Sequence, residues 1–119
     1  MLYDANTPIW MQVADAINTD LVTCRRAPGE KLPGGRDAAL QYSINPNTAA
    51  RVYKELENEA LVETRLGMGT FVTEDRARIG ALRAQMAEKA VREFMNTRSK
   101  LGVSREEAAR MIREGNENA

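Results

Sequence analysis

The feature that most constrains the fold is a predicted helix that begins near residue 45. Asn45 can cap such a helix, and Pro46 suits its first turn. Apolar side chains then recur at three- and four-residue steps, on one side of the helix: Ala49, Val52, Tyr53, Leu56 and Ala60. Asn47, Thr48 and Arg51 lie on another side, at its N-terminal end. The helix is therefore predicted to bury one face in a core and to leave a polar face free for binding.

Two helices are predicted before this one and a hairpin after it. Thr7 as the N-cap and Pro8 at the first position indicate a helix over residues 8–23, and a shorter helix fits residues 35–42. Short strands are predicted at residues 61–64 and 70–73, with glycines between them that permit a tight turn. Three helices followed by a hairpin are typical of a winged helix-turn-helix domain, whose third helix enters the DNA major groove.

The C-terminal part of the chain is predicted to be almost wholly helical. One amphipathic helix is expected over residues 75–100, and a capping box at Ser104 starts a last helix that runs through Ile112. Two such helices cannot bury their apolar faces alone, so they must pack on the first part of the chain, on each other or on a second copy of the chain; the contact with a second copy is the one we predict. The residues assigned to the contact are Ile79, Leu82, Met86, Val91 and Phe94. The predicted fold is mainly α with a small β-hairpin: a winged helix-turn-helix domain at residues 1–73 and a two-helix dimerisation tail at residues 74–119.

Composition excludes several kinds of chemistry. The chain has no histidine and one cysteine, which rules out imidazole acid–base catalysis, zinc sites that use histidine and an internal disulfide. No nucleophile is paired with a base, and no P-loop or dinucleotide motif is present. We therefore expect no enzyme activity, no cofactor and no metal. Cys24 is interpreted as a small residue at a helix end rather than a redox switch.

The charge is balanced overall but unevenly distributed. The 17 basic and 17 acidic side chains cancel, yet residues 1–75 carry 7 basic and 11 acidic side chains and residues 76–119 carry 10 and 6. The seven cations of the first part are predicted to share one face: Arg25, Arg26, Lys31, Arg36, Arg51, Lys54 and Arg65. The acidic residues expected elsewhere are Asp15, Asp20, Glu57, Glu59 and Glu63. No apolar run is longer than three residues and no signal peptide is recognisable, so a cytoplasmic protein without membrane contact is expected.

Four stretches, in this order and at this spacing, resemble the DNA-binding domain of GntR-type bacterial transcription regulators. They are residues 8–13, 28–36, 45–57 and 67–72. The short C-terminal part resembles the YtrA-like branch, in which a two-helix tail serves dimerisation. The resemblance implies a nucleoid-associated homodimer that binds an inverted repeat in double-stranded DNA. It further implies a repressor of its own operon and of ABC-transporter genes.

Carried over position by position, the resemblance assigns DNA contact to the second helix, the start of the third helix and the hairpin tip, or wing. The positions are Arg36, Asn45, Pro46, Asn47, Thr48, Arg51, Gly67 and Gly69. An asparagine can pair with adenine, and a threonine can offer its hydroxyl or its methyl group. Arg51 can reach guanine or a phosphate, and the sequence leaves both open.

Each assignment has a structural alternative. Asn45 can be a helix cap alone, Arg36 a solvated charge, and the two wing glycines the requirement of a tight turn. The chain also departs from the family pattern at three positions: Gly34 replaces a serine, Ala60 a glycine, and Met68 an often basic residue. The acidic balance of residues 1–75 favours a second function, a winged-helix protein–protein interaction module. An effector is not identifiable from the sequence.

Overall fold

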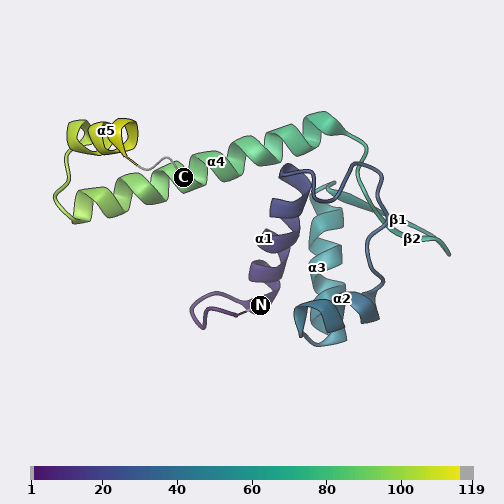
Figure 1. Cartoon of the computed structure of the whole chain (residues 1–119). Helices are drawn as coiled ribbons and strands as arrows, with labels where there is room; N and C mark the ends of the chain where they lie inside the picture. Colours follow the sequence, from purple (N-terminus) through teal and green to yellow (C-terminus); the bar gives the residue numbers. More distant parts are fainter. Residues whose placement is uncertain (1, 116–119) are drawn as a thin grey trace. The chain divides into compact units, whose positions relative to one another are not determined.

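The computed structural model describes residues 2–115, which form five helices and one two-stranded sheet (Figure 1). Their order is α1 (Ile9–Val22), α2 (Gly35–Tyr42), α3 (Pro46–Asn58), β1 (Val62–Arg65), β2 (Gly69–Val72), α4 (Arg76–Lys100) and α5 (Arg105–Glu114). The predicted mainly α fold with a small hairpin is confirmed.

The chain forms two compact units that divide between Arg83 and Ala84, inside α4. We call residues 2–83 the head and residues 84–115 the tail unit. The sequence prediction put the boundary after residue 73, but the first turns of α4 belong to the head. Leu82 is buried there, and Arg78 donates a 2.8 Å hydrogen bond to the Glu59 carbonyl oxygen.

α1 begins one residue later than the sequence indicates. Pro8 occupies the N-cap position and no side chain caps the helix, so the predicted Thr7 cap is wrong. The side-chain amide of Gln12 instead donates to the carbonyl oxygens of Asp4 (2.7 Å) and Thr7 (2.8 Å), which fixes the chain that leads into the helix. The Gln12 side chain thus fixes the approach to the helix, but it does not accept from the amides of the first turn as a cap would.

α3 begins as the sequence predicts. Asn45 is the N-cap, and its side-chain oxygen accepts a 2.7 Å hydrogen bond from the Asn47 amide. The apolar face of the helix is buried at Ala49, Val52 and Leu56. These side chains join a core whose largest fully buried members are Val13, Leu21, Val52, Leu61 and Val72.

Tyr53 fastens α3 to the segment before α2. It is half-buried, it packs beside Ala38, Ala39 and Ala49, and its hydroxyl donates a 2.5 Å hydrogen bond to the Pro33 carbonyl oxygen. Burial raises the pKa of Tyr53 to about 12, so the phenol stays protonated and able to donate. The interpretation of Tyr53 as a core residue fits this position.

The hairpin pairs β1 with β2 in antiparallel register, with Val62 opposite Val72 and Arg65 opposite Gly69. Both strands lie one residue nearer the tip than predicted. A third segment lies beside β2: the Leu32 amide donates to the Thr70 carbonyl oxygen (2.8 Å), and the Val72 amide donates to the Glu30 carbonyl oxygen (2.8 Å). These bonds hold the hairpin against the head.

The prediction that Ala60 extends the apolar stripe of α3 is wrong, because the helix ends at Asn58 and Ala60 is exposed. Its φ of 59° is left-handed. The Ala60 amide donates to the Glu57 carbonyl oxygen (2.9 Å), and the Leu61 amide donates to the Leu56 carbonyl oxygen (3.0 Å). This is the helix-ending motif in which glycine is usual. Alanine therefore occupies a conformation that costs an L-residue free energy.

Replacing Ala60 by glycine should stabilise the protein by about 1 kcal/mol, because glycine adopts the left-handed region without steric cost. Urea denaturation of the two proteins measures the difference. Ala50→Gly is the matched control: Ala50 is also exposed but lies inside α3, so glycine there should destabilise by roughly 1 kcal/mol. A less stable A60G protein would contradict the assigned backbone conformation.

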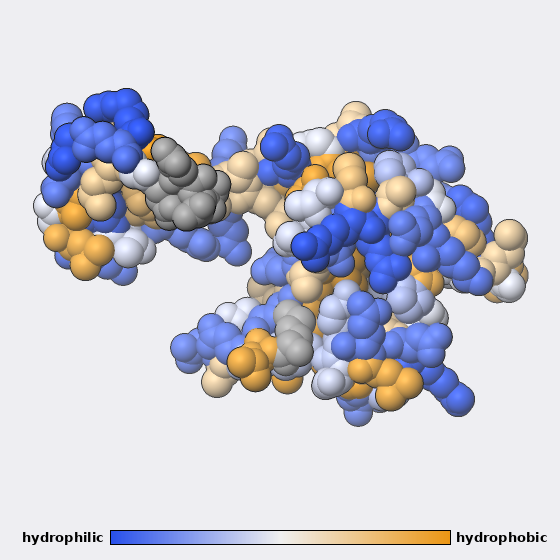
Figure 2. Space-filling model, viewed as in Figure 1, coloured by the Kyte–Doolittle hydropathy of each residue, from blue (hydrophilic) through white to orange (hydrophobic). Residues whose placement is uncertain are grey.

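The tail unit pairs the end of α4 with α5. Ser104 caps α5 by accepting a 3.0 Å hydrogen bond from the Glu107 amide, as predicted, and Arg98 donates to the Val103 carbonyl oxygen (2.8 Å). A groove of about 350 Å³ lies within this unit, lined mainly by apolar side chains that include Phe94 and Ile112. Figure 2 shows apolar, orange surface around the turn between α4 and α5. Within residues 2–115, no helix is long and apolar enough to cross a membrane.

Candidate nucleic-acid interface

One face of α3 is free of the core. The side chains of Asn47, Ala50, Arg51 and Lys54 recur at three- and four-residue steps and are all exposed. Thr48 is half-buried beside them. This face begins at the helix N-terminus, where the helix dipole favours an anion. Pro46 has no N–H, and the amides of Asn47 and Ala49 are bonded to Asn45, so the amide of Thr48 is the one left to bind a ligand in the first turn. Ala50 belongs to this face although the sequence analysis did not single it out; its position three residues after Asn47 is the signal that identifies it.

Arg51 is held by a residue of another helix. Its guanidinium carbon lies 4.3 Å from the centre of the Trp10 ring, which is half-buried on α1. A cation over an indole face is attracted by the ring quadrupole and loses side-chain freedom. The guanidinium is thereby kept on the side of α3 that faces α1 while it remains exposed.

A surface groove between α2 and α3 brings together two of the predicted site residues. Arg36 and Pro46 both line it, together with the exposed Leu40. Gly34 is the N-cap of α2 and no side chain caps the helix, so the missing family serine is not replaced by another group. The first turns of α2 and α3 therefore border one continuous surface.

The wing is a tight turn at the far end of β1. Gly67 and Gly69 have φ values of 75° and 120°, and the Met68 amide donates a 2.9 Å hydrogen bond to the Arg65 carbonyl oxygen. A side chain at Gly69 would meet Lys31, whose Cε lies 2.8 Å from the position of such a Cβ atom. Both glycines are thus required by backbone conformation. The structure places them at the hairpin tip and not beside the first turn of α3.

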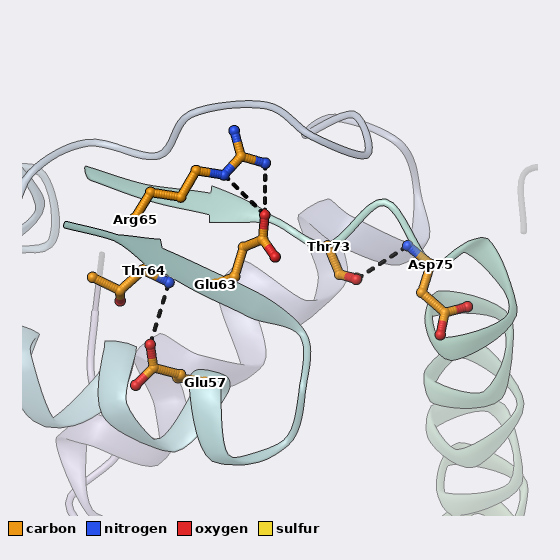
Figure 3. A network of polar contacts seen from close by, with 6 residues as sticks. All are labelled: Glu57, Glu63, Thr64, Arg65, Thr73 and Asp75. Atoms are coloured by element: carbon orange, nitrogen blue, oxygen red, sulfur yellow. Dashed lines mark hydrogen bonds and ion pairs between the residues drawn. The ribbon is translucent and has the colours of Figure 1, made fainter. Parts of the chain in front are cut away.

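Polar contacts fix the base of the wing to the rest of the head (Figure 3). The Glu57 carboxylate, near the C-terminal end of α3, accepts a 3.2 Å hydrogen bond from the Thr64 amide of β1. Arg65 forms an ion pair with Glu63 at 2.6 Å, and its guanidinium carbon lies 4.1 Å from the centre of the Phe71 ring. The Glu57–Thr64 contact therefore orients the wing relative to α3, while the contacts of Arg65 lie within the hairpin.

The predicted single face of seven cations needs correction. Arg26 pairs with Glu30 at 3.0 Å, and Arg65 pairs with Glu63, an acid that the sequence analysis placed elsewhere. Within residues 2–115, the other five are exposed and form no ion pair: Arg25, Lys31, Arg36, Arg51 and Lys54. Local pairing thus leaves fewer free cations in the head than the residue count suggests.

The residues assigned to dimerisation differ in burial. Leu82 is 5% exposed within its own chain, whereas Ile79 and Met86 are half-buried. Val91 and Phe94 are 58% and 45% exposed. Leu82 therefore belongs to the core of the head, and the free apolar surface lies further along α4.

These features define a class of protein. Three helices, a short hairpin and an exposed polar face at the start of the third helix form a winged helix-turn-helix DNA-binding domain.

The chain belongs to the GntR family, described as bacterial regulatory proteins, which matches residues 11–72. Over 105 residues it is 37% identical to the uncharacterized HTH-type transcriptional regulator YhcF of Bacillus subtilis, covering 88% of this chain and 87% of that protein. It is 38% identical over 71 residues to the HTH-type transcriptional repressor YtrA of the same organism, covering 60% of this chain and 55% of YtrA. The predicted resemblance to YtrA-like regulators is confirmed.

A solved structure supports the same fold over most of the chain. The GntR family transcriptional regulator from Listeria monocytogenes superimposes with a TM-score of 0.88 at 32% identity, covering 96% of this chain and all of that one. GntR-family transcriptional regulators are DNA-binding proteins without enzymatic activity, and this chain is one of them.

Proposed function

We propose that the protein is a homodimeric repressor that binds an inverted repeat in double-stranded DNA through two heads. The observation that carries this proposal is the exposed polar face at the N-terminal end of α3. Asn47 is free to pair with adenine in the major groove, and Thr48 can offer its hydroxyl or its methyl group. Since the Asn45 side-chain oxygen is used by the cap, its role is to hold the first turn of α3 in shape.

The remaining head residues serve the sugar-phosphate backbone in this proposal. Arg36 and Pro46 border one groove beside the N-terminus of α3, so a phosphate there meets a guanidinium and the positive end of a helix dipole together. Gly67 and Gly69 let the wing approach a second stretch of backbone without side chains of their own. Such contacts set the register of the protein on DNA rather than its sequence preference.

Dimerisation is proposed to bury the apolar groove of the tail unit. Phe94, Leu101, Met111 and Ile112 line this groove and are 45%, 73%, 56% and 70% exposed. Apolar surface of this kind, rimmed by charged residues, marks an association site. Met86 and Val91 extend the same contact along α4. A second copy related by a two-fold axis would present two heads with the symmetry of an inverted repeat.

The proposed targets are the protein's own operon and ABC-transporter genes, as the resemblance to the YtrA-like branch implies. The name of the relative YtrA supports the role of repressor. The proposed place of action is the bacterial cytoplasm, at the nucleoid.

Footprinting on the DNA upstream of the gene tests this proposal. Hydroxyl-radical cleavage should show two protected segments related by a two-fold axis, with centres about 10 bp apart or a multiple of that distance. The same DNA with one half-site scrambled serves as the control and should bind much more weakly. A single protected segment without two-fold symmetry would rule out binding as a homodimer to an inverted repeat.

A second function, a protein–protein interaction module, is favoured by the charge of residues 1–75, where 7 basic side chains face 11 acidic ones. Gel shift against the organism's genomic fragments separates the two. A repressor should retard the migration of particular fragments at moderate salt, whereas an interaction module should retard none.

A further inference from the structure

The wing carries apolar side chains at its tip where a cation is common in this type of domain. Leu66 is completely exposed and Met68 is 59% exposed, and they stand on either side of Gly67. Single exposed apolar residues are ordinary on protein surfaces, but two at the end of one narrow hairpin form a defined apolar point.

The tip is thin and firmly held. Between Arg65 and Thr70 only Leu66 and Met68 have side chains, because Gly67 and Gly69 supply the turn. The turn is closed by the hydrogen bond from the Met68 amide to the Arg65 carbonyl oxygen, and β2 is bonded to residues 30 and 32 behind it. A thin, fixed ribbon can enter the minor groove of B-DNA, which is about 6 Å wide.

Positive charge lies just behind this apolar point. The Lys31 side chain runs beside Gly69, and Lys31 forms no ion pair within residues 2–115. The Arg65 guanidinium lies over Phe71, but its charge is paired with Glu63 at 2.6 Å. Lys31 is therefore the free cation that matches a phosphate at the border of the minor groove, beside the apolar tip. A free cation at this place fits a nucleic-acid groove better than a protein surface, which would need none.

We propose that Leu66, supported by Met68, inserts as a wedge into the minor groove beside each half-site and selects a deformable pyrimidine–purine step there. This rests on the proposed function, because α3 must first dock in the major groove. Leucine and methionine offer no hydrogen bond to a base edge, so they cannot read sequence directly. An apolar side chain between base pairs instead unstacks a step and bends the duplex. Steps such as TA and CA unstack at least cost, so preference arises from deformability.

The test uses the full chain and a duplex that the protein itself selects from a random library. The double variant Leu66→Ala/Met68→Ala is compared with the natural protein, and both side chains are exposed, so folding should be unaffected. We expect binding to weaken roughly tenfold or more, the effect of leaving one leucine side chain unburied. The salt dependence should not change, because no charge is altered.

Two readouts are specific to the wedge. Fluorescence of 2-aminopurine at the flanking step should rise severalfold when the natural protein binds, and the bend measured by energy transfer between the duplex ends should increase. Both signals should be lost in the double variant and kept in Leu66→Met, which retains an apolar wedge. Leu2→Ala is the matched control, since Leu2 is 99% exposed outside the hairpin and should change neither signal.

The outcomes separate the two proposals. If the natural protein binds its selected duplex but the double variant gives the same bend, fluorescence and step preference, the wedge is overturned and the repressor proposal stands. If the double variant binds the selected duplex as tightly as the natural protein does, the wing does not contribute to DNA affinity and the wedge is again overturned. If the natural protein selects no DNA sequence, the proposed function fails and the wedge fails with it.

Discussion

Replacing Phe94 and Ile112 by aspartate should convert the protein to a monomer and weaken operator binding at least about a hundredfold. Both side chains line the apolar groove of the tail unit, and a buried, unpaired carboxylate there would cost far more than the contact gains. Two heads on one operator gain affinity because the second head binds at high effective concentration, and that gain is lost in a monomer. Sedimentation equilibrium gives the oligomeric state, and gel shift gives the affinity.

The matched control is Gln85→Asp with Asn96→Asp. It adds two acidic groups to the same helix at exposed positions that lie on the other side of α4 from Phe94. This protein should stay dimeric and bind the operator nearly as well as the natural one. Circular dichroism establishes that both variants keep their helices. A Phe94→Asp/Ile112→Asp protein that remains a dimer would place the interface elsewhere.

The helices could be predicted because their start signals are local. The beginning of α3 follows from two adjacent residues, the cap Asn45 and Pro46 at the first helical position. The bounds of α2 follow from Gly34 and Gly35 before it and from Asn45, the cap of the next helix, after it. The end of α3 could not be predicted as well. A repeating apolar pattern continues through Ala60, but the backbone at that residue turns left-handed, which periodicity cannot reveal.

The hairpin and the site depended on contacts between distant parts of the chain. The hairpin is held in the head by the bonds that residues 30 and 32 make to β2, and no local pattern at residues 61–73 contains them. The same holds for Arg51, whose position is set by Trp10 on α1. The sequence could name the residues of the polar face, but only the structure shows how each is held.

Pairing also changes what the charge balance means for DNA binding. Because Arg26 and Arg65 are engaged by carboxylates, each head neutralises few phosphates, so one head alone should bind DNA weakly and with a shallow salt dependence. Three cations of the positive residues 76–119 belong to the head, Arg76, Arg78 and Arg83, and Arg78 is paired with Glu59 at 3.3 Å. We therefore expect tight binding to need two heads on one operator, which makes the proposed dimerisation part of DNA recognition.

Asn47 and Arg51 should give opposite kinds of defect although they share one helix face. Asn47→Ala should cost about 1–3 kcal/mol of binding free energy and relax the preference at one base pair, because Asn47 stands free at the start of α3. Arg51→Ala should weaken binding to all sequences alike and lower the salt slope by about 1. The reason is that Trp10 holds the Arg51 guanidinium on the side of α3 that faces α1, where we expect a phosphate rather than a base edge.

Substitutions that keep part of each group make this distinction sharper. Arg51→Lys preserves the charge and should retain most of the affinity if the contact is to phosphate, whereas a bidentate contact to guanine would be lost. Trp10→Leu removes the stacking partner of Arg51. It should weaken DNA binding less than Arg51→Ala does and leave the base preference unchanged. Asn58→Ala and Arg92→Ala are matched controls, since both residues are exposed, one at the far end of α3 and one in the tail unit. Selection from a random DNA library gives the base preference of each of the six variants. Titration over a series of salt concentrations gives the affinity and the salt slope. A relaxed base preference in Arg51→Ala would show that this guanidinium leaves Trp10 to read a base.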